Sequence, residues 1–460
     1  MSARRIVHTN VTLEEIRAAL EEAPLAAIRQ ELTDRNIIDA CDQCRHNWRN
    51  RLYNPIVTVL HFIAQALQRE LSFAATWQEL WAPVAALYPQ AFPSKWDPSA
   101  LTHARGRLPQ GVLTILAEES CRRARQLPPP LWRKLRLVAL DASALSMPRE
   151  KHLFDHFGAH KARSTTVRYP LATFASLLEV GSSLVLDYRF GPFDPGELST
   201  AGPLLSSLGK GDLLLADRHF SNAPFLIQAR MTGADFLMRK NARLRVDRLP
   251  VIKRLGRQDF ITEIPISKPV RKKYPHLPPA IRARVFRSYW KAPGGRRISE
   301  WFVTSLEENR FKKSTLARLY SRRWRAETSF LEFKQTFHAD VLRSKTVANV
   351  RKEFAAHLLA YQLVRLLMAH AARRCRRKPT GISTVNAARW IMGFSRVMAT
   401  LPAARLPRAY AVLLEVIVSS QIDIRPGRTE PRSLTREWKH YPHLRTSRSD
   451  WRTERLAIPS

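Results

Sequence analysis

Three acidic residues stand where a carboxylate could do chemistry: Asp141, Asp217 and Glu327. Each aspartate directly follows an apolar run that is typical of a buried β-strand. In open α/β sheets the carboxyl ends of the strands form the edge that carries function. An aspartate after a strand is more often a turn or a helix cap, and a glutamate near arginines is more often part of a solvated ion pair. A further signal must therefore decide whether the three acids act together.

That signal lies in a helix predicted from Lys313 to about His338. Four polar residues occur in it at offsets of 0, 3, 7 and 14: Tyr320, Arg323, Glu327 and Lys334. At about 100° per residue they fall within an arc of roughly 60°, so they line one face of the helix. A carboxylate on this face can complete a metal site, and the flanking cations can hold DNA phosphates. About 80° further round lies a second face, predicted to pack on a sheet, which is formed by Leu319, Ala326, Phe330 and Phe333.

The elements that must position these residues are predicted from apolar runs in the middle of the chain. Strands are expected over 135–140, 171–177, 184–190, 212–216 and 235–239, with helices over 203–208 and 222–232. This order, β-rich and then alternating, indicates an α/β fold with a mixed sheet. Residues 241–306 differ, because short β-like runs over 260–266, 282–289 and 301–305 lie between Pro and Gly turns. We interpret them as a β-rich insertion.

The two flanks of this region are predicted to be helical. Residues 1–128 are mostly helical, with a basic, turn-like stretch over 101–109 before a helix over 112–125, and Pro128–Pro130 is a linker. A small helical DNA-binding module is plausible in this first region. Helices are also expected over 350–374 and 381–421. The end, 425–460, is basic and poor in aliphatic residues, so a loosely ordered tail is expected.

Composition narrows the partners. The 460 residues are 45% hydrophobic, which allows a sizeable core and excludes wholesale disorder. Lys and Arg number 76 and Asp and Glu 39, a net charge of +37. Such a surplus repels itself unless a polyanion neutralises it, so nucleic acid is the leading partner and an anionic membrane surface the lesser one.

The same composition indicates the compartment. No stretch of about 20 residues is apolar enough to span a membrane, and no signal peptide is expected at the start. Four cysteines are too few for a disulfide scaffold, so a reduced, cytoplasmic protein is expected. Cys41 and Cys44 have zinc-like spacing, but Cys121 and Cys375 form no second pair, which favours buried thiols.

The helix motif resembles the signature of the insertion sequence four family of bacterial transposases: Tyr, two residues, Arg, three residues, Glu, six residues, Lys. Residues 320–334 match it without a gap. The resemblance extends to Asp141, although the family often has Gly where Ala142 stands here, and to Asp217 in the motif Asp-Arg-x-Phe. The aspartates are 76 positions apart and Asp217 and Glu327 are 110 apart, a gap that matches the family's β-rich insertion.

The resemblance implies a ribonuclease H-like fold and a set of site residues. Asp141, Asp217 and Glu327 are implied as the catalytic triad that holds two Mg²⁺ ions, with Mn²⁺ as an alternative. The residues implied to bind DNA are Tyr320, Arg323, Lys334, Arg239 at the end of a strand, and Trp301, where some relatives stack a flipped base.

The expected organisation has five parts. These are a helical DNA-end-binding domain over 1–128, a ribonuclease H-like core over 129–240 and 307–375 with the insertion over 241–306, and a helical C-terminal region with the basic tail over 376–460. The expected partner is double-stranded DNA, both transposon ends and target, bound by a homodimer on the bacterial nucleoid, with no membrane involved.

The function expected from this resemblance is DNA transposition: binding of terminal inverted repeats, followed by metal-dependent cleavage and strand transfer. Two alternatives stay open. A catalytically silent DNA-binding relative or transposition inhibitor is opposed by the three intact acids. A metal-dependent nuclease that does not rejoin DNA is opposed by Arg323 and Lys334, because joining must hold DNA ends after cleavage.

Overall fold

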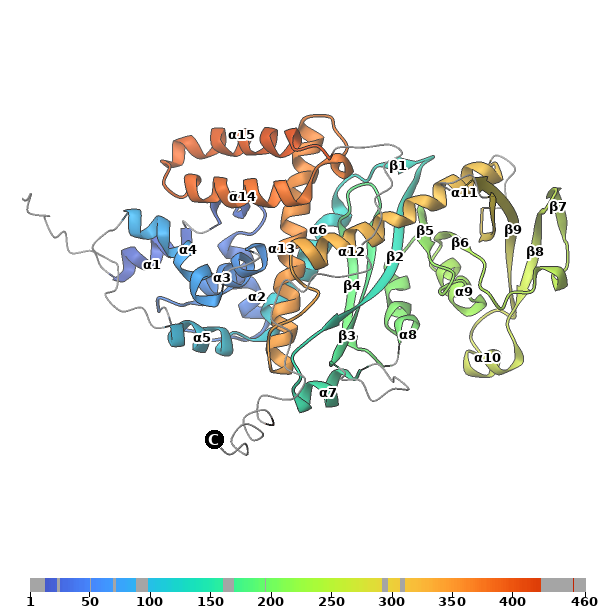
Figure 1. Ribbon diagram of the computed structural model, residues 1–460, viewed down its shortest axis with the longest axis horizontal. Coiled ribbons are helices and arrows are strands. Elements are labelled where there is room, and N and C mark those ends of the chain that lie inside the picture. Colours follow the sequence, from blue (N-terminus) through green and yellow to red (C-terminus); the bar gives the residue numbers. More distant parts are fainter. Residues whose placement is uncertain are drawn as a thin grey trace, which may run out of the picture. The chain divides into compact units, whose positions relative to one another are not determined.

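The structure is a computed structural model of the chain (Figure 1). It describes residues 13–22, 25–49, 51–68, 72–87, 98–159, 169–194, 196–291, 297–306, 311–422 and 450. The tail expected over 425–460 lies outside this set, except for residue 450. The chain divides into two units. We call Met1–Ser120, Ser146–Pro170 and Glu332–Ser460 the helical unit, and Cys121–Leu145 and Leu171–Leu331 the sheet unit.

The sheet unit is built on one ten-stranded sheet, counted over the described residues. Its strands are β1 (Leu131–Trp132), β2 (Leu135–Ser146), β3 (Leu171–Glu179), β4 (Val185–Pro192), β5 (Asp212–Ala216), β6 (Asp235–Arg239), β7 (Lys253–Gly256), β8 (Asp259–Pro265), β9 (Ala280–Lys291) and β10 (Arg297–Thr304). The order across the sheet is β4-β3-β2-β5-β6-β10-β9-β8-β7, and β1 pairs with β2. The predicted mixed α/β sheet is therefore confirmed.

Two parallel strand pairs lie at the centre of the sheet. β5 pairs in parallel with β2 on one side and β6 on the other. The remaining pairs beyond β6 are antiparallel, from β6–β10 through β9 and β8 to β7. All five residues of β5 are buried, because helices cover both faces of such a central strand, and this is why its sequence is a continuous apolar run.

The strands over 241–306 extend this sheet. β10 pairs directly with β6, with Phe302 opposite Arg239, and β9, β8 and β7 follow outwards. A buried bidentate ion pair stabilises this half: Arg284 Nε and Nη2 donate to the Asp259 carboxylate at 2.7 and 2.6 Å. Asp259 and Arg284 lie on the neighbouring strands β8 and β9. The β-rich segment and the central strands thus share one continuous set of backbone hydrogen bonds.

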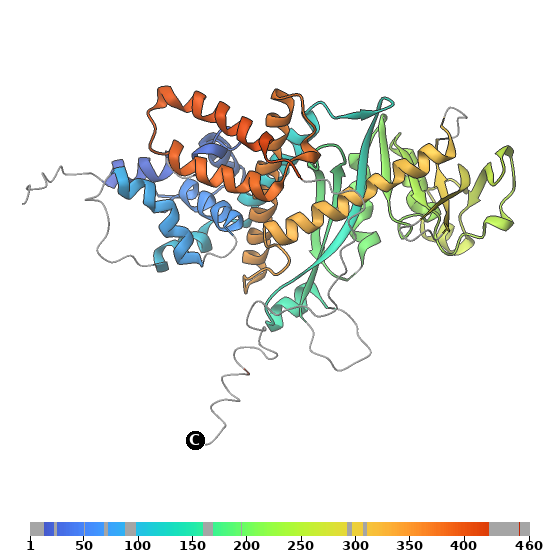
Figure 2. The ribbon, with the colours of Figure 1, turned by 45° about the horizontal axis from the view of Figure 1, so that its top comes forward.

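Short helices connect and cover the strands of the sheet unit. They are α8 (Glu197–Ala201), the 3₁₀ turn η3 (Gly202–Ser207), α9 (Ala223–Met231), η4 (Val246–Arg248), α10 (Lys268–Lys273), α11 (Lys313–Tyr320), η5 (Ser321–Arg323) and α12 (Trp324–Thr336), the last of which continues into the helical unit. Figures 1 and 2 show α12 crossing β2. Phe330 of α12 packs edge-on against Phe174 of β3, with ring centroids 5.2 Å apart.

The helical unit contains the remaining helices. They are α1 (Leu13–Glu22), η1 (Ala26–Ile28), α2 (Asp34–Gln43), α3 (Pro55–Leu67), α4 (Phe73–Leu87), α5 (Pro98–Arg107), the first part of α6 (Gln110–Gln126), α7 (Lys151–Phe157), α13 (Val347–Arg374), η6 (Pro379–Gly381), α14 (Thr384–Met398), η7 (Ala403–Arg405) and α15 (Leu406–Ser419). The stretch over 101–109, predicted to be turn-like, is mostly helix α5. That prediction was wrong because Gly106 is tolerated within the helix despite its low propensity.

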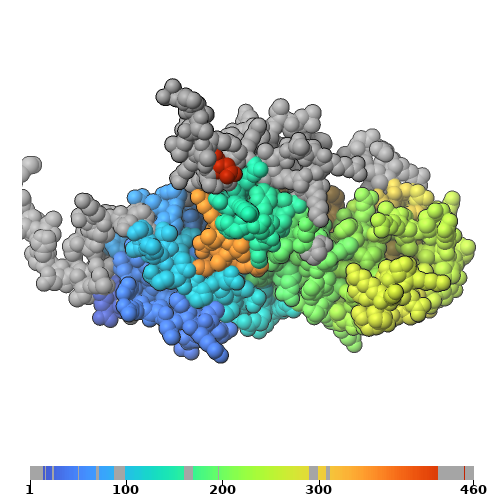
Figure 3. All heavy atoms as spheres, turned by 90° about the horizontal axis from the view of Figure 1, so that it is seen from below, coloured from blue at the N-terminus to red at the C-terminus, as the bar shows by residue number. Residues whose placement is uncertain are grey.

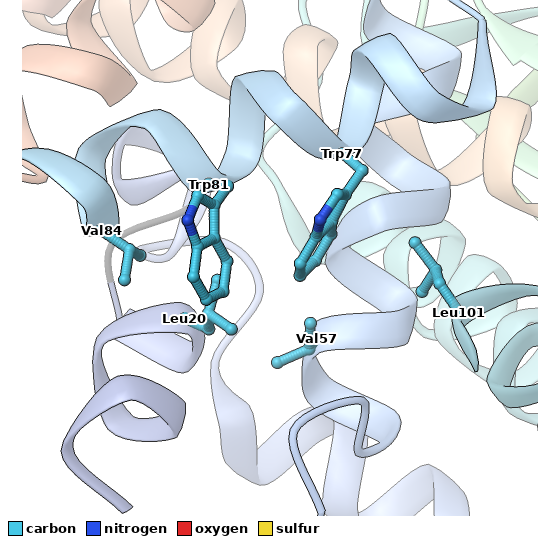
Figure 4. Close-up of a cluster of buried hydrophobic side chains, with 6 residues drawn as sticks. All are labelled: Leu20, Val57, Trp77, Trp81, Val84 and Leu101. Carbon is cyan, nitrogen blue, oxygen red and sulfur yellow. The ribbon is translucent and has the colours of Figure 1, made fainter. Parts of the chain in front are cut away.

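The long helix α13 is central to the helical unit. It contacts α3, α7, α14 and α15, and its buried residues lie all around its axis, as expected for a helix enclosed by others. Figure 3 shows orange atoms of this unit flanked by the N-terminal helices in blue and by α7 in teal. A second core lies among the N-terminal helices, where Trp77 and Trp81 of α4 pack with centroids 5.4 Å apart over Leu20 and Val57 (Figure 4).

Across all described residues, no helix is both long enough and apolar enough to cross a membrane.

Candidate active site

The pairing of β2 with β5 brings Asp141 and Asp217 to neighbouring backbone positions. Leu140 is paired in parallel register with Ala216, and the two aspartates are the next residues on each chain. Neighbouring strands are about 4.8 Å apart, so the two carboxylates start from adjacent points at the end of this pairing. Asp141 was predicted to end its strand, and this is wrong in detail. β2 continues to Ser146, and only its pairing with β5 ends before Asp141.

Arg323 connects Asp141 to Glu327. Its Nη1 lies 3.8 Å from Oδ2 of Asp141, and its Nη2 donates to Oε1 of Glu327 at 2.5 Å. The Arg323 side chain is only 4% exposed, whereas that of Glu327 is 40% exposed. The glutamate on the helix and the aspartate on the strand are therefore partners of one buried guanidinium.

The predicted continuous helix is interrupted where Arg323 lies. α11 ends at Tyr320, residues 321–323 form a 3₁₀ turn, and α12 begins at Trp324. A 3₁₀ turn has 3.0 residues per turn, so Tyr320 is rotated away from the position that a regular α-helix would give it. This turn contains no Gly or Pro that would predict it from the sequence. It orients Arg323 towards Asp141 of β2.

A second guanidinium, that of Arg239, holds Asp217. Nη2 of Arg239 donates to Oδ1 of Asp217 at 2.8 Å, and Nη1 lies 3.8 Å from Oε1 of Glu300. Arg239 ends β6, the strand beside β5, so this contact follows from strand order. Tyr320 donates its hydroxyl to the carbonyl of Ala216, the residue before Asp217, at 3.2 Å. Arg239 and Tyr320 thus fix the position of the second aspartate.

The two aspartates have opposite electrostatic environments. Burial raises the pKa of Asp141 to about 6, and Glu327 and Glu197 add to this rise, while the Ala142 amide and Arg323 oppose it. Burial also acts to raise the pKa of Asp217, but the hydrogen bond from Arg239 and the arginine charges outweigh it, so this pKa is lowered. Asp217 is therefore firmly ionised at neutral pH, whereas Asp141 titrates closer to neutrality.

Arg323 remains a cation in spite of its burial. Burial acts to lower its pKa, but Tyr320, Glu327 and Asp141 together raise it. Burial raises the pKa of Tyr320, so its hydroxyl stays protonated and remains a hydrogen-bond donor. The acids are consequently neutralised by arginine in this arrangement.

The donor set suits a divalent ion by its chemistry, because carboxylate oxygens are hard ligands. In the described part of the chain, however, no three His, Cys, Asp or Glu residues are close enough to hold a metal ion together. For Asp141 and Glu327, Arg323 explains why the two carboxylates do not form a metal site, since its guanidinium lies between them. A cation already occupies the space between two of the acids.

Two further residues were predicted to bind DNA, Trp301 and Lys334. Trp301 of β10 adjoins Phe302, whose ring packs against Tyr320 at 5.3 Å. Since successive side chains of a strand point to opposite faces, Trp301 lies on the other face, beside Arg287, whose guanidinium carbon is 5.9 Å from its ring centre. Lys334 lies seven residues after Glu327 on α12, in the part belonging to the helical unit, and burial lowers its pKa.

The predicted apolar face of the helix is confirmed, with one difference. Its members Leu319, Ala326, Phe330 and Phe333 are all buried. Phe330 packs on the sheet as predicted, but Phe333 packs against Phe354 and Tyr361 of α13.

Sequence reasoning missed Glu197 and Glu300. Glu197 begins α8 and its charge acts on Asp141, and Glu300 of β10 approaches Arg239. Neither belongs to a motif, and strand pairing alone brings Glu300 near the site, so no local signal could have found them. Cys41 and Cys44 are free thiols, and burial raises the pKa of Cys41 to about 12.

Comparison with known proteins identifies the family. The sequence model of the family described as "Transposase DDE domain" matches residues 132–363, half of the chain. The chain belongs to this family. The matched segment contains all three acids, and the enzyme is a DNA transposase, a class that cleaves DNA and transfers strands with divalent metal ions and has DNA as its partner. The function predicted from the 320–334 motif is thereby confirmed.

Two further comparisons concern individual proteins. The transposase is 26% identical over 355 residues to "Transposase InsG for insertion sequence element IS4" of Escherichia coli (strain K12), which covers 75% of this chain and 78% of the relative. This similarity supports the predicted insertion sequence four membership. A solved structure, "Cryo-EM structure of piggyBac transposase synaptic complex with hairpin DNA", matches with a TM-score of 0.43 and 11% identity over 88% of this chain and 87% of that chain.

Proposed function

We propose that Asp141, Asp217 and Glu327 are the catalytic triad of this transposase and hold two Mg²⁺ ions, with Mn²⁺ as an alternative. The observation that supports this most strongly is the parallel register of β2 and β5, which sets the two aspartates side by side. The shared contact of Arg323 with Asp141 and Glu327 links the third acid to them. Asp141, Asp217 and Glu327 would supply the carboxylate oxygens that hold the ions.

The central strands support a ribonuclease H-like core. The strand order is β4-β3-β2-β5-β6, with parallel pairs at β2–β5 and β5–β6. It puts β2 and β5, the first and fourth of these five strands along the chain, side by side. When bound by these acids, divalent ions would supply the Lewis acidity that an in-line phosphodiester displacement needs at the attacking and leaving oxygens. The chain's own part is to position the acids: Arg239 and Tyr320 hold the end of β5, and Arg323 orients Glu327.

The remaining finer assignments follow from the family resemblance. The residues that bind DNA are Tyr320, Arg323, Lys334, Arg239 and Trp301. Residues 1–128 bind the terminal inverted repeats, 129–240 and 307–375 form the core, 241–306 is the insertion, and 376–460 is the C-terminal region. Two copies pair two DNA ends, and the enzyme acts in the bacterial cytoplasm on nucleoid DNA.

The test separates cleavage from binding. Asp141→Asn, Asp217→Asn and Glu327→Gln should each abolish cleavage of a duplex carrying the inverted repeat that flanks the gene, in Mg²⁺, while end binding stays within a few-fold. Each change removes a metal ligand and no phosphate contact. Asp247→Asn is the matched control, because this fully exposed aspartate of η4 pairs only with the nearby Arg245 in the described structure.

The same assay distinguishes the alternatives. A catalytically silent relative would bind ends without cutting in the wild type, and a simple nuclease would cut without joining a pre-cut end to target DNA. Normal cutting by Glu327→Gln would show that the triad assignment is wrong.

A further inference from the structure

We propose that a basic, aromatic-lined hollow in the helical unit binds one unpaired nucleotide of a DNA end. The hollow has a volume of about 260 Å³, and the lining residues that carry the argument are His46, Trp48, Arg49, Arg51 and Arg107. This inference rests on the transposase function and adds to it a ligand site outside the acid cluster.

One wall of the hollow is the connection between α2 and α3, and helix caps fix both of its ends. At the start, the amide of Cys44 donates to the carbonyl of Ala40 at 3.2 Å, closing α2. At the other end, Oδ1 of Asn54 accepts from the amide of Val57 at 3.1 Å, opening α3. A Cβ on Gly111 of α6 would come within 2.8 Å of Sγ of Cys44, so α6 also lies tightly against this wall.

The opposite wall is the end of α5, which a buried lysine holds. Nζ of Lys352, a side chain of α13, donates to the carbonyls of Arg105 and Gly106 at 2.7 and 3.1 Å. The last carbonyls of a helix carry partial negative charge, so a cation there is favourable. Arg107, the last residue of α5, is therefore presented from a fixed helix end.

The hollow has a surplus of positive charge. Arg49, Arg51 and Arg107 are all exposed, and among the described residues no carboxylate is paired with any of them. Burial lowers the pKa of His46, and the charges of Arg107 and Lys352 lower it further, which shows that the hollow repels an additional proton. Such a site favours an anion, and arginine is the side chain best suited to phosphate.

The aromatic wall and the size of the hollow indicate which kind of anion it binds. Trp48 lines the hollow, is 36% exposed, and its ring stacks with that of His46, with centroids 6.1 Å apart and ring planes at 26°, so part of the indole surface is accessible to a ligand. A volume of 260 Å³ is below the roughly 300–1,000 Å³ of pockets for drug-sized ligands, so a single base can enter while its phosphate stays at the rim, and a duplex cannot enter. Stacking on an aromatic ring needs an unpaired base and tolerates any sequence. A single unpaired nucleotide satisfies charge, stacking and size together.

The decisive experiment compares two DNA probes of the same sequence with the full-length protein. One is a fully paired duplex, and the other carries a short single-stranded overhang that contains 2-aminopurine. In the wild type, the overhang should raise affinity and stacking should quench the 2-aminopurine fluorescence. Trp48→Ala should weaken binding of the overhang probe by about 5- to 100-fold and remove the quenching, while the paired duplex binds within about two-fold of wild type.

Trp390→Ala is the matched control, because Trp390 is 44% exposed in the same unit and does not line the hollow. Equal overhang binding by Trp48→Ala and Trp390→Ala would overturn the proposal. That result would leave the triad's cleavage test untouched, so the two failures are distinguishable.

Arginine variants test the phosphate contacts. Arg49→Gln and Arg107→Gln should each lower the slope of log affinity against log salt for the overhang probe by about 0.7, the value of one single-strand phosphate contact. Arg405→Gln and Arg408→Gln remove the same charge from exposed positions of the same unit and should leave the slope unchanged. Identical slopes in all four variants would also overturn the proposal.

Discussion

At the scale of single residues, Arg323 determines how the acids are arranged. A buried guanidinium that contacts two carboxylates is costly to remove, because each partner is left as an uncompensated charge. From the sequence, Arg323 was expected to grip phosphate from the same helix face as Glu327. Its 4% exposure and its contacts show that in this arrangement its partners are the acids. Its role toward DNA stays a prediction.

Arg323→Lys should lower the rate of DNA cleavage by about ten-fold or more while end binding stays within a few-fold. Lysine has one ammonium and cannot reproduce a forked contact with two carboxylates, and a lost charge-assisted contact is worth roughly 1.5–3 kcal/mol. The measurement is single-turnover cleavage of uncut and pre-cut ends.

Arg322→Lys is the matched control, because Arg322 is the exposed neighbour in the same 3₁₀ turn and should cleave normally. Arg325, two residues after Arg323, is unsuitable as a control, because its Nε donates to Oγ of Ser183 in the turn between β3 and β4. Equal defects in Arg322→Lys and Arg323→Lys would show that only general basic charge matters.

At the scale of elements, the local sequence predicted the type of each helix or strand better than the residue at which it ends. The strands β5 and β6 have the predicted bounds, because each is a short apolar run bounded by turns. β2 is longer than predicted, because whether the strand continues beyond Leu140 depends on neighbouring strands rather than on its own composition. The 3₁₀ turn before Trp324 has no Gly or Pro to signal it, so only tertiary contacts explain it.

The residues of the site could be predicted from the sequence, but not all of their positions. The 320–334 motif identified Arg323, Glu327 and Tyr320 as one group, and the structure brings all three to Asp141 within β2 and to the end of β5. The motif could not show which face of the sheet Trp301 occupies, because that depends on how β10 pairs with β6 and β9. Contacts made between distant segments leave no local pattern.

A buried histidine of α3 should make the helical unit sensitive to acid. Burial and the charge of Arg105 lower the pKa of His61 to about 3. Above pH 6.5 the ring is neutral in both folded and unfolded chains. Below it, the unfolded chain binds a proton that the folded chain excludes, so the free energy of unfolding should fall by about 2 kcal/mol on going to pH 5.

Denaturant unfolding at pH 7 and pH 5 measures this effect. His61→Gln should lose that part of the pH dependence, whereas His103→Gln, at an exposed position, should keep it. The hydrogen bonds explain the neutral ring, since Nδ1 of His61 faces the permanent donor Nη1 of Arg105 at 3.2 Å. The same pH dependence in wild type and His61→Gln would contradict this assignment.

At the scale of the whole molecule, the net charge of +37 should dominate binding at low salt. The transposase should bind any duplex under those conditions, and preference for its own ends should emerge only as salt rises, because phosphate contacts release counterions while base contacts do not. Fluorescence anisotropy with end DNA and unrelated DNA across a salt series measures both the general affinity for duplex and the preference for the ends. A flat salt response for unrelated DNA would contradict the assignment of the charge to phosphate.

The pairing of β10 with β6 has a consequence for the history of the gene. The chain leaves the central strands at Arg239 and returns beside it at Phe302, so the intervening segment begins and ends at one place. DNA inserted or lost in the loops between β7, β8 and β9 changes the length of chain between Asp217 and Glu327 but can leave the pairing of β6 with β10 and the packing of β9 on α11 in place. Selection on the acids therefore leaves the length of this segment open, and searches for relatives by fixed spacing should allow the interval after Asp217 to vary most.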